Sequence, residues 1–310
     1  MTKVKENISL LNLSNYKIGG PARFLFVAKT EQDISAGIKL AKAKRQKIFI
    51  LGGGTNLLIS DKGFPGFVIK PDLDFRSKKG EKINIGAGTS ISDLLNFTVK
   101  NKLSGFEWAG GLPGTVGGAI YGNAGAFAGE IKDSVELVRS FNIKTEKFVE
   151  RDKEECNFEY RSSIFKKKRG EEIIVSAVFK LALGSHEKIK TAILEKIKHR
   201  EERQPLEYPN VGSIFKNVDV RKFPKGKLGE VAHVVKKDPF PVIPTAYLIA
   251  EAGLKGISFG GAMISPKHPN FIVNAENATA NDVLALISLV KSEVKRKFGV
   301  ILEEEVQMVS

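Results

Sequence analysis

The sequence predicts a mixed α and β fold that is divided into more than one domain. The chain has 310 residues, which is enough for two or three domains with a substantial core. Strand-like apolar runs alternate along it with segments of helical periodicity. Hydrophobic residues make up 42% and charged residues 27%, the balance of an ordinary soluble globular protein.

The first seventy residues are expected to form a small α/β unit. Residues 23–28, 48–51 and 67–69 are short apolar runs typical of strands. A helix is predicted after the first of them, because Thr30 and Asp33 have the spacing of a capping pair at a helix start.

The middle of the chain continues with strands and helices up to a candidate boundary near Pro205. A capping pair, Ser90 and Asp93, marks the start of a helix there. The predicted elements are strands at 82–88, 135–143 and 171–183 and helices at 90–103 and 185–203.

The last third begins with a turn-rich segment and ends with a strand. Thr279 and Asp282 mark the start of a long helix, and Gly299 follows its end. The other predicted elements are a helix at 245–254 and strands at 270–274 and 300–309.

Residues 108–129 form an uncharged stretch with eight glycines. A membrane span needs ~20 predominantly apolar residues, but Pro113 and the glycines leave too few large apolar side chains. Glycine also has a low helix propensity, so a helix this rich in glycine would be intrinsically unstable. The stretch is therefore interpreted as a turn-rich loop buried against protein or ligand, and no membrane insertion is expected.

A second glycine cluster, "LGGGTN", follows the strand at 48–51. The P-loop and Rossmann glycine patterns are both absent from the chain. Glycines still let backbone N–H groups approach a phosphate, and Thr55 and Asn56 add side-chain donors. A tight turn without a ligand explains the cluster equally well at this stage.

The formal net charge is +14, which attracts nucleic acid, anionic membranes or polyanionic small ligands. No zinc-finger or aromatic RNA-binding signature accompanies it, so a solvated basic surface is favoured over nucleic-acid binding. The histidines are scattered and predict no metal site. Cys156 is the only cysteine, which fits a reducing, cytoplasmic location.

Three further segments have residue types suited to chemistry: "FEYRSSIFKKK", "VGSIFKN" and "LEEEVQMV". Each also has an ordinary explanation. Arg161 could form a surface ion pair, Ser213 could be a turn hydroxyl, and Glu305 could belong to a solvated acidic strand end. The residue pattern alone does not choose between these alternatives.

The motifs taken together resemble the UDP-N-acetylenolpyruvoylglucosamine reductase (UDP-N-acetylmuramate dehydrogenase) family. The resemblance runs from about residue 13 to 306 and rests on several segments in one order. These are "NYKIGGPARFLFVA", "LGGGTNLLISDKGFPGFVI", "AGGLPGTVGGAIYGNAGAFAGEI", "EYRSSIFK", "GSIFKN", "LIAEAGLKGISFGGAMISPKHPNFIVN" and "LEEEV". The simple "YRSSIFK" region resembles the shorter subtype, which lacks an extra tyrosine-bearing loop. Asn15 and Val218 depart from the family's usual threonine and proline.

The resemblance implies an α+β fold, with a two-part FAD-binding module of the vanillyl-alcohol-oxidase (PCMH) type and a C-terminal α/β substrate domain. The implied domains are residues 1–71 and 72–202 for the two FAD subdomains, the second with the returning strand at 299–310, and 203–298 for the UDP-sugar. FAD is the implied cofactor and NADPH the implied hydride source. The implied reaction converts UDP-N-acetylglucosamine enolpyruvate to UDP-N-acetylmuramate, and a monomer is expected.

The resemblance also implies roles for individual residues. Arg161 would bind the substrate carboxylate, Ser213 would donate a proton to carbon, and Glu305 would assist only when neutral or sharing a proton. Tyr160, Lys216 and Asn217 would hold the sugar diphosphate. The implied FAD contacts are Gly52, Gly53, Gly54, Thr55, Asn56, Leu57, Pro113, Gly114, Thr115, Gly117, Gly118, Asn123 and Gly125.

Two other functions remain open at this stage. A different flavin oxidase of the same fold would share the glycine clusters but not "GSIFKN" and "LEEEV". A basic nucleic-acid-binding protein would bind DNA or RNA with a steep dependence on salt and would carry no flavin.

Overall fold

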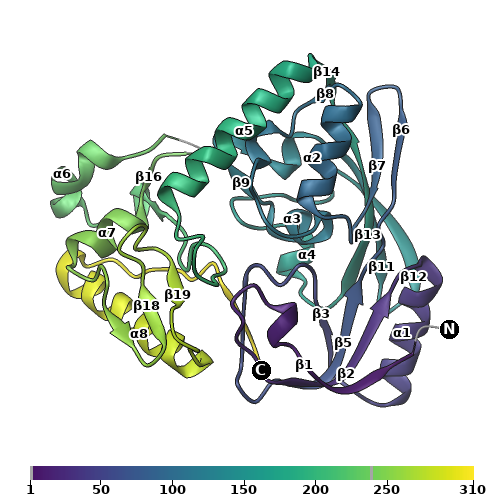
Figure 1. The fold of residues 1–310 in the computed structure, drawn as a ribbon, viewed down its shortest axis with the longest axis horizontal. Coiled ribbons are helices and arrows are strands. Elements are labelled where there is room, and N and C mark those ends of the chain that lie inside the picture. Colours follow the sequence, from purple (N-terminus) through teal and green to yellow (C-terminus); the bar gives the residue numbers. More distant parts are fainter. Residues whose placement is uncertain (1–2, 238–239) are drawn as a thin grey trace. The chain divides into compact units, whose positions relative to one another are not determined.

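The computed structural model describes residues 3–237 and 240–310, and the chain divides into two compact units (Figure 1). The first unit comprises Met1–Ile8, Ala22–Gly53 and Pro65–Arg200. The second comprises Ser9–Pro21, Gly54–Phe64 and Glu201–Ser310. Within the described residues, no helix combines the length and apolar character that crossing a membrane requires.

The early strands and the first helix form as the sequence predicts. The sheet order is β1-β2-β5-β3, with β3 and β5 parallel. Thr30 and Asp33 form the predicted capping box of α1, whose buried residues contact Phe26 and Phe67 in one core cluster. The bounds are β1 (Lys5–Ser9), β2 (Pro21–Ala28), α1 (Glu31–Ala43), β3 (Ile48–Ile50), β4 (Leu57–Ile59) and β5 (Phe64–Pro71).

The larger sheet of the first unit is antiparallel, with the order β12-β11-β13-β7-β6. Its inner residues share one core cluster with α2, α3 and α5, which cover the same face (Figure 1). The bounds are β6 (Arg76–Lys79), β7 (Lys82–Gly86), α2 (Ile91–Lys100), β8 (Leu103–Ser104), α3 (Val116–Gly122), β9 (Gly125–Ala126), β10 (Gly129–Glu130), β11 (Val135–Asn142), β12 (Lys147–Asp152), α4 (Ile164–Lys167), β13 (Glu172–Lys180), β14 (Ala182–Leu183) and α5 (His186–Arg203).

The Gly-rich stretch was wrongly predicted to be only a loop, because it contains the two-turn helix α3. Thr115 caps this helix by accepting a hydrogen bond from Gly118 N at 3.4 Å. Val116, Ala119 and Ile120 are buried in the core. Burial of these apolar residues and the cap outweigh the poor helix propensity of glycine.

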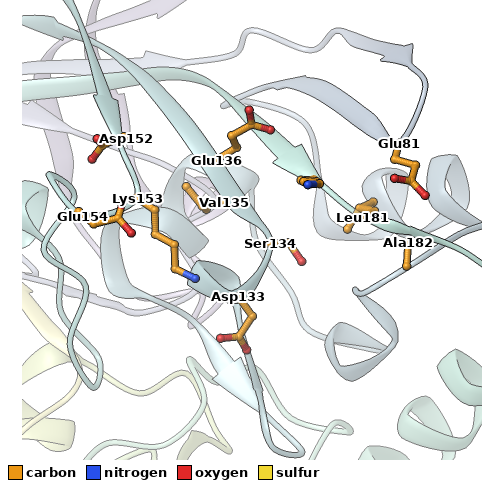
Figure 2. Close-up of a pocket in the computed structure, with 11 residues that line it drawn as sticks. Glu81, Asp133, Ser134, Val135, Glu136, Asp152, Lys153, Glu154, Leu181 and Ala182 are labelled. Carbon is orange, nitrogen blue, oxygen red and sulfur yellow. The ribbon is translucent and has the colours of Figure 1, made fainter.

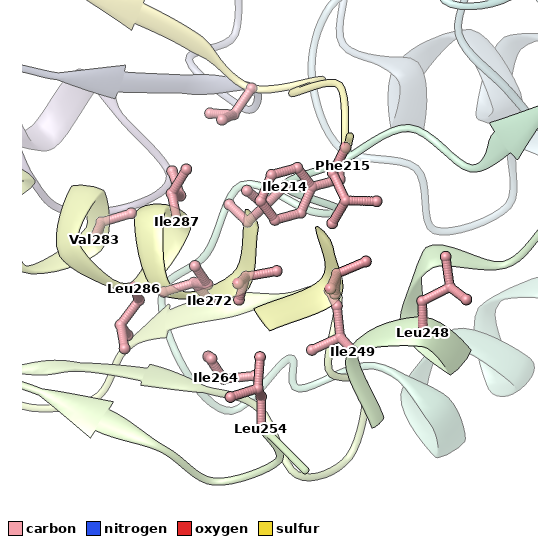
Figure 3. Packing of buried hydrophobic residues seen from close by; sticks show 14 of the residues in the cluster. Ile214, Phe215, Leu248, Ile249, Leu254, Ile264, Ile272, Val283, Leu286 and Ile287 are labelled. Carbon is pink, nitrogen blue, oxygen red and sulfur yellow. The ribbon is translucent and has the colours of Figure 1, made fainter. Parts of the chain in front are cut away.

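The second unit contains the three-stranded sheet β17-β18-β19 and has its own core, formed mainly by α7, α8, β18 and β19 (Figure 3). Thr279 and Asp282 form the predicted capping box of α8, and Gly299 ends it in the left-handed conformation with φ +74°. The bounds are β15 (Val218–Asp219), α6 (Leu228–Val231), β16 (Val242–Ile243), α7 (Thr245–Glu251), β17 (Ser258–Phe259), β18 (Ala262–Ile264), β19 (Ile272–Asn274), α8 (Ala280–Phe298) and β20 (Gln307–Val309).

The final strand is shorter than the predicted 300–309, because regular pairing covers only β20. It runs parallel to β4, with Gln307 opposite Leu57 and Val309 opposite Ile59. This partner lies in the first of the two predicted FAD subdomains. The domain boundaries themselves stay a prediction, although the division between the compact units at Arg200 and Glu201 lies close to Pro205.

Candidate functional site

In the first unit, the two glycine clusters meet through bare backbone. A Cβ on Gly53 would lie 2.8 Å from Gly114 Cα, and one on Gly52 would lie 3.4 Å from Thr115 Oγ1. Gly117 is held by a 2.9 Å hydrogen bond from its N–H to Ala87 O. These approaches leave no room for a side chain at position 53. Pro113 and Gly118 are exposed beside this contact.

Arg161 is presented by a tight turn in the first unit. The ends of the turn, Glu159 and Ser162, exchange two backbone hydrogen bonds of 3.0 and 3.1 Å. Arg161 itself has φ +56°, a left-handed conformation that favours glycine. An arginine held in such a conformation is a strained position of the kind that clusters at functional sites.

The Arg161 side chain lies against the Gly-rich segment. Its Nη2 donates to Gly125 O at 2.8 Å, which joins a predicted catalytic residue to a predicted cofactor contact. Its guanidinium carbon lies 5.0 Å from the centre of the Tyr160 ring. Lys166 Nζ donates to Arg161 O at 2.9 Å, so the main chain is fixed as well. The three predicted residues Tyr160, Arg161 and Gly125 are therefore neighbours.

Asn123 has a structural role next to this turn. It ends α3 in the left-handed conformation and is fully buried. Its Nδ2 donates to Glu159 O at 2.9 Å, and its Oδ1 accepts from Lys132 N at 3.3 Å. Because the protein already uses its side-chain amide, the predicted role of Asn123 as a cofactor contact stays a prediction.

The sequence did not single out Arg200, which lies near Arg161. Its Nε donates to Gly110 O at 2.8 Å, and its side chain is buried. Burial, and in second place the positive charge of Arg161, lowers the pKa of Arg200. Within residues 3–237 and 240–310 its Nη2 has no hydrogen-bond partner. The pattern of a mostly charged helix predicts that an arginine near its end faces solvent, so nothing in the sequence indicated that Arg200 is buried.

Cys156 is buried in the core cluster of the first unit. Burial raises the pKa of its thiol to about 12. The thiolate is the reactive form of cysteine. At neutral pH the thiol is therefore protonated, and Cys156 fills the core rather than acting as a nucleophile.

In the second unit, the segment that holds Ser213 pairs with the segment that holds Glu305. Glu305 N donates to Ile214 O at 2.8 Å, and Lys216 N donates to Glu303 O at 2.9 Å. Phe215 and Glu304 form an isolated antiparallel bridge between these two segments. Ser213 is half-buried, as is Glu305. The pairing thus brings two of the predicted catalytic residues into adjacent segments.

The second half of "LGGGTN" supports Glu305. Asn56 Nδ2 donates to the main-chain oxygen of Glu305 at 3.1 Å, and Gln307 N donates to Asn56 O at 3.1 Å. Gly54 has φ +67°, and a Cβ on it would lie 1.9 Å from Leu13 O. Leu57 begins β4. Thr55 is half-buried beside Asn56, and the expected role of both side chains as phosphate donors stays a prediction.

The two predicted diphosphate residues of the second unit also contact the chain. Lys216 Nζ forms an ion pair with Glu303. Asn217 Oδ1 accepts from Thr245 N at 3.2 Å, and Thr245 Oγ1 donates to Lys216 O at 2.6 Å. These bonds fix the positions of Lys216 and Asn217. The role of the two side chains in binding the sugar diphosphate stays a prediction.

A hollow on the first unit has the wrong chemistry for a polyanionic ligand (Figure 2). Acidic side chains dominate its lining, and none of the predicted site residues belongs to it. Carboxylates repel phosphate groups. Across the described parts of the chain, no three histidine, cysteine or acidic residues are grouped to hold a metal ion. The lining residues include Glu81, Asp133, Glu136, Asp152, Lys153, Glu154 and Lys180.

Two family descriptions match the chain. An FAD binding domain matches residues 22–147. The C-terminal domain of UDP-N-acetylenolpyruvoylglucosamine reductase matches residues 204–309.

Curated relatives extend this similarity to nearly the whole chain. A UDP-N-acetylenolpyruvoylglucosamine reductase of Caldanaerobacter subterraneus subsp. tengcongensis is 40% identical, over 99% of this chain and 94% of the relative. One of Clostridium botulinum (strain Alaska E43 / Type E3) is 36% identical, over 99% of this chain and 93% of the relative. The crystal structure of UDP-N-acetylenolpyruvylglucosamine reductase from Thermus caldophilus has a TM-score of 0.79 and 30% identity, and the match covers 100% of both chains.

Proposed function

Because the chain belongs to the UDP-N-acetylenolpyruvoylglucosamine reductase family, we propose how its own residues carry out that family's reaction. With FAD as cofactor and NADPH as co-substrate, the chain reduces UDP-N-acetylglucosamine enolpyruvate to UDP-N-acetylmuramate, a peptidoglycan precursor. The observation that carries the residue assignment is the pairing in the second unit, where Glu305 N donates to Ile214 O, next to Ser213.

The glycine contact of the first unit suits a flavin dinucleotide. Gly52, Gly53, Gly114 and Thr115 present main chain without bulky side chains, and such backbone lets amide groups approach a diphosphate. Bound FAD supplies the means of passing a hydride from NADPH to the methylene carbon of the enolpyruvyl group. The residues proposed to hold it include those of both glycine clusters named above.

The second carbon of the enolpyruvyl group becomes electron-rich when the methylene carbon accepts a hydride. The charge spreads into the neighbouring carboxylate, which becomes an enediolate. Arg161 is proposed to bind this carboxylate, because a guanidinium stays charged and matches two carboxylate oxygens at once. Its strained backbone and its bond to Gly125 O support a fixed orientation for this task.

Ser213 is proposed to deliver the proton that completes the reaction at this electron-rich carbon. A serine hydroxyl is a weak acid, so it can act only on a strongly basic carbon and needs a group that restores its proton. Glu305 is proposed to assist at the carboxylate, a role that requires it to carry or share a proton, because two negative charges repel each other. Tyr160, Lys216 and Asn217 are proposed to hold the sugar diphosphate.

We also propose where and in what form the protein works. Use of NADPH and the presence of a single cysteine fit a reducing, cytoplasmic location. A monomer is the expected form, with small-molecule substrates as its binding partners.

An anaerobic experiment tests the function directly. The purified protein is expected to be yellow, and NADPH is expected to bleach the flavin absorbance. Addition of UDP-N-acetylglucosamine enolpyruvate is then expected to restore the colour, while UDP-N-acetylglucosamine, which lacks the enolpyruvyl group, leaves the flavin reduced. A colourless protein that cannot be reconstituted with FAD would overturn the proposal, as would a flavin that only oxygen reoxidises.

Gly53→Ala is expected to weaken FAD binding about tenfold or more, because the new methyl group would lie 2.8 Å from Gly114 Cα, a main-chain atom. The dissociation constant of FAD, measured by quenching of flavin fluorescence, checks this. Gly229→Ala is the matched control, since a Cβ there meets nothing within 4 Å. Thermal melting of the apoprotein shows whether the variant folds. Unchanged FAD affinity in folded Gly53→Ala would contradict the proposal that the contact between the two glycine clusters holds FAD.

A further inference from the structure

The segment that holds Ser213 has a second neighbour in the second unit, on the other side from Glu305. This neighbour is Asn270, which is 3% exposed. Its main-chain oxygen accepts a hydrogen bond from Ile214 N at 2.8 Å. Its side-chain Oδ1 accepts from Phe215 N at 3.1 Å, and its Nδ2 donates to Phe215 O at 2.8 Å. One residue therefore makes three hydrogen bonds to the two residues that follow Ser213.

The side-chain amide of Asn270 pairs with the main chain of Phe215 in the way that a neighbouring strand would. An amide offers one acceptor and one donor, and Phe215 presents the complementary N–H and C=O groups. Both backbone groups belong to a buried residue, and a buried polar group without a hydrogen-bond partner destabilises the fold. No shorter, longer or apolar side chain pairs both groups in the same way.

The residue that makes these bonds is itself held rigidly. It lies in the turn from Ser265 to Phe271, where Ser265 N donates to Phe271 O at 2.9 Å and Phe271 N donates to His268 O at 2.9 Å. Ser265 Oγ accepts from His268 N at 3.2 Å. These hydrogen bonds fix the main chain on both sides of Asn270.

Ile214 and Phe215 are anchored on their side-chain side as well. Both are buried to 1% exposure or less and lie in the core of the second unit beside Ile272 (Figure 3). Core packing, the Glu303–Glu305 segment and Asn270 therefore hold the main chain directly after Ser213 in place. Asn270 bonds to Phe215 through its side chain, so this contact can be changed without moving another main-chain segment.

We propose that Asn270 is a positioning residue that sets the place of the Ser213 hydroxyl for proton transfer. The proposal rests on the role of Ser213 given above. Asn270 acts through the backbone of Ile214 and Phe215 and does not itself take part in the chemistry. A displacement of about 1 Å at a reacting group lowers rates about a hundredfold. Because loss of the Asn270 amide is expected to displace the Ser213 hydroxyl, it should slow chiefly the step that uses Ser213.

Asn270→Asp tests this, because the carboxylate keeps the shape of the amide and accepts from Phe215 N but cannot donate to Phe215 O. Reoxidation of the reduced flavin by the enolpyruvyl substrate is expected to slow at least about tenfold. Flavin reduction by NADPH is expected to change by less than about twofold, since it needs no proton from Ser213. Both half-reactions are measured anaerobically by rapid mixing.

Asn274→Asp is the matched control for a purely structural effect. Asn274 is also buried in the second unit, at 7% exposure; its Nδ2 donates to Tyr16 O at 3.0 Å and its Oδ1 accepts from Ala278 N at 2.7 Å. Both variants lose a buried amide donor, so both are expected to melt at a lower temperature. Only Asn270→Asp is expected to separate the two half-reactions. Equal slowing of both half-reactions in folded Asn270→Asp, or the same separation in Asn274→Asp, overturns the proposal.

A double variant distinguishes failure of this proposal from failure of the role given to Ser213. In a Ser213→Ala background, Asn270→Asp is expected to add less than about twofold to the slowing, because its effect passes through the missing hydroxyl. A full further tenfold loss there shows that Asn270 acts by another route. If Ser213→Ala alone does not separate the half-reactions, the role of Ser213 fails first. If Asn270→Asp does not fold, Asn270→Gln keeps both amide groups one methylene further out and carries the same expectation.

Discussion

Ser213→Ala is expected to slow reoxidation of the reduced flavin by UDP-N-acetylglucosamine enolpyruvate about 10²- to 10⁴-fold, the range typical of a lost general acid. Reduction of the flavin by NADPH is expected to stay nearly unchanged, because that half-reaction requires no proton at the substrate carbon. Anaerobic rapid mixing, with flavin absorbance as the signal, measures each half-reaction separately.

The backbone around Ser213 makes this a clean substitution. Ile214 and Phe215 are held by the core, by Asn270 and by the Glu303–Glu305 segment, so removal of one hydroxyl leaves the chain path unchanged. Ser258→Ala, at an exposed position of β17 in the same unit, is expected to leave both half-reactions unchanged. Equal damage to both half-reactions in Ser213→Ala would argue against a proton donor and for a general role in binding.

The elements predicted correctly from the sequence are those with a local signature. The capping pairs at Thr30, Ser90 and Thr279 all mark the starts of observed helices, because a cap involves residues three apart in the chain. The helix α3 was missed for the opposite reason. Its glycines argue against a helix locally, while the packing of Val116, Ala119 and Ile120 that stabilises it comes from distant strands.

The site shows the same division between local and distant information. The motifs indicated Arg161, Ser213 and Glu305, whose roles stay predictions, and they could not show that Glu305 N bonds to Ile214 O, a contact between residues far apart in the sequence. Asn270 lies 55 residues from its partner Phe215, and no spacing rule connects them. Arg200 was missed because burial of a guanidinium is not visible in a helix of mostly charged residues.

Arg161→Met is expected to slow flavin reoxidation by the enolpyruvyl substrate about 10²- to 10³-fold, because the substrate carboxylate loses the charged partner that stabilises the enediolate. Binding of UDP-N-acetylglucosamine, which has no carboxylate, is expected to change by less than about twofold. Arg161→Lys is expected to recover only part of the rate, since an ammonium group keeps the charge but not the two-pronged geometry. Rapid mixing and equilibrium titration of the oxidised protein supply these values.

The backbone of Arg161 allows a second, independent measurement. Its φ of +56° is a conformation that costs a non-glycine residue about 1–2 kcal/mol. Arg161→Gly relieves this cost, so it is expected to be as inactive as Arg161→Met and yet to melt at a higher temperature than that variant. Lys102→Gly is the matched control: Lys102 is exposed with φ +55° and lies outside the proposed site, so stability is expected to rise while both half-reactions keep their rates. If Arg161→Gly retains the reoxidation rate, the guanidinium does not hold the carboxylate. If Arg161→Gly is inactive and melts above Arg161→Met, the chain keeps a strained arginine at this turn for its chemistry rather than for its fold.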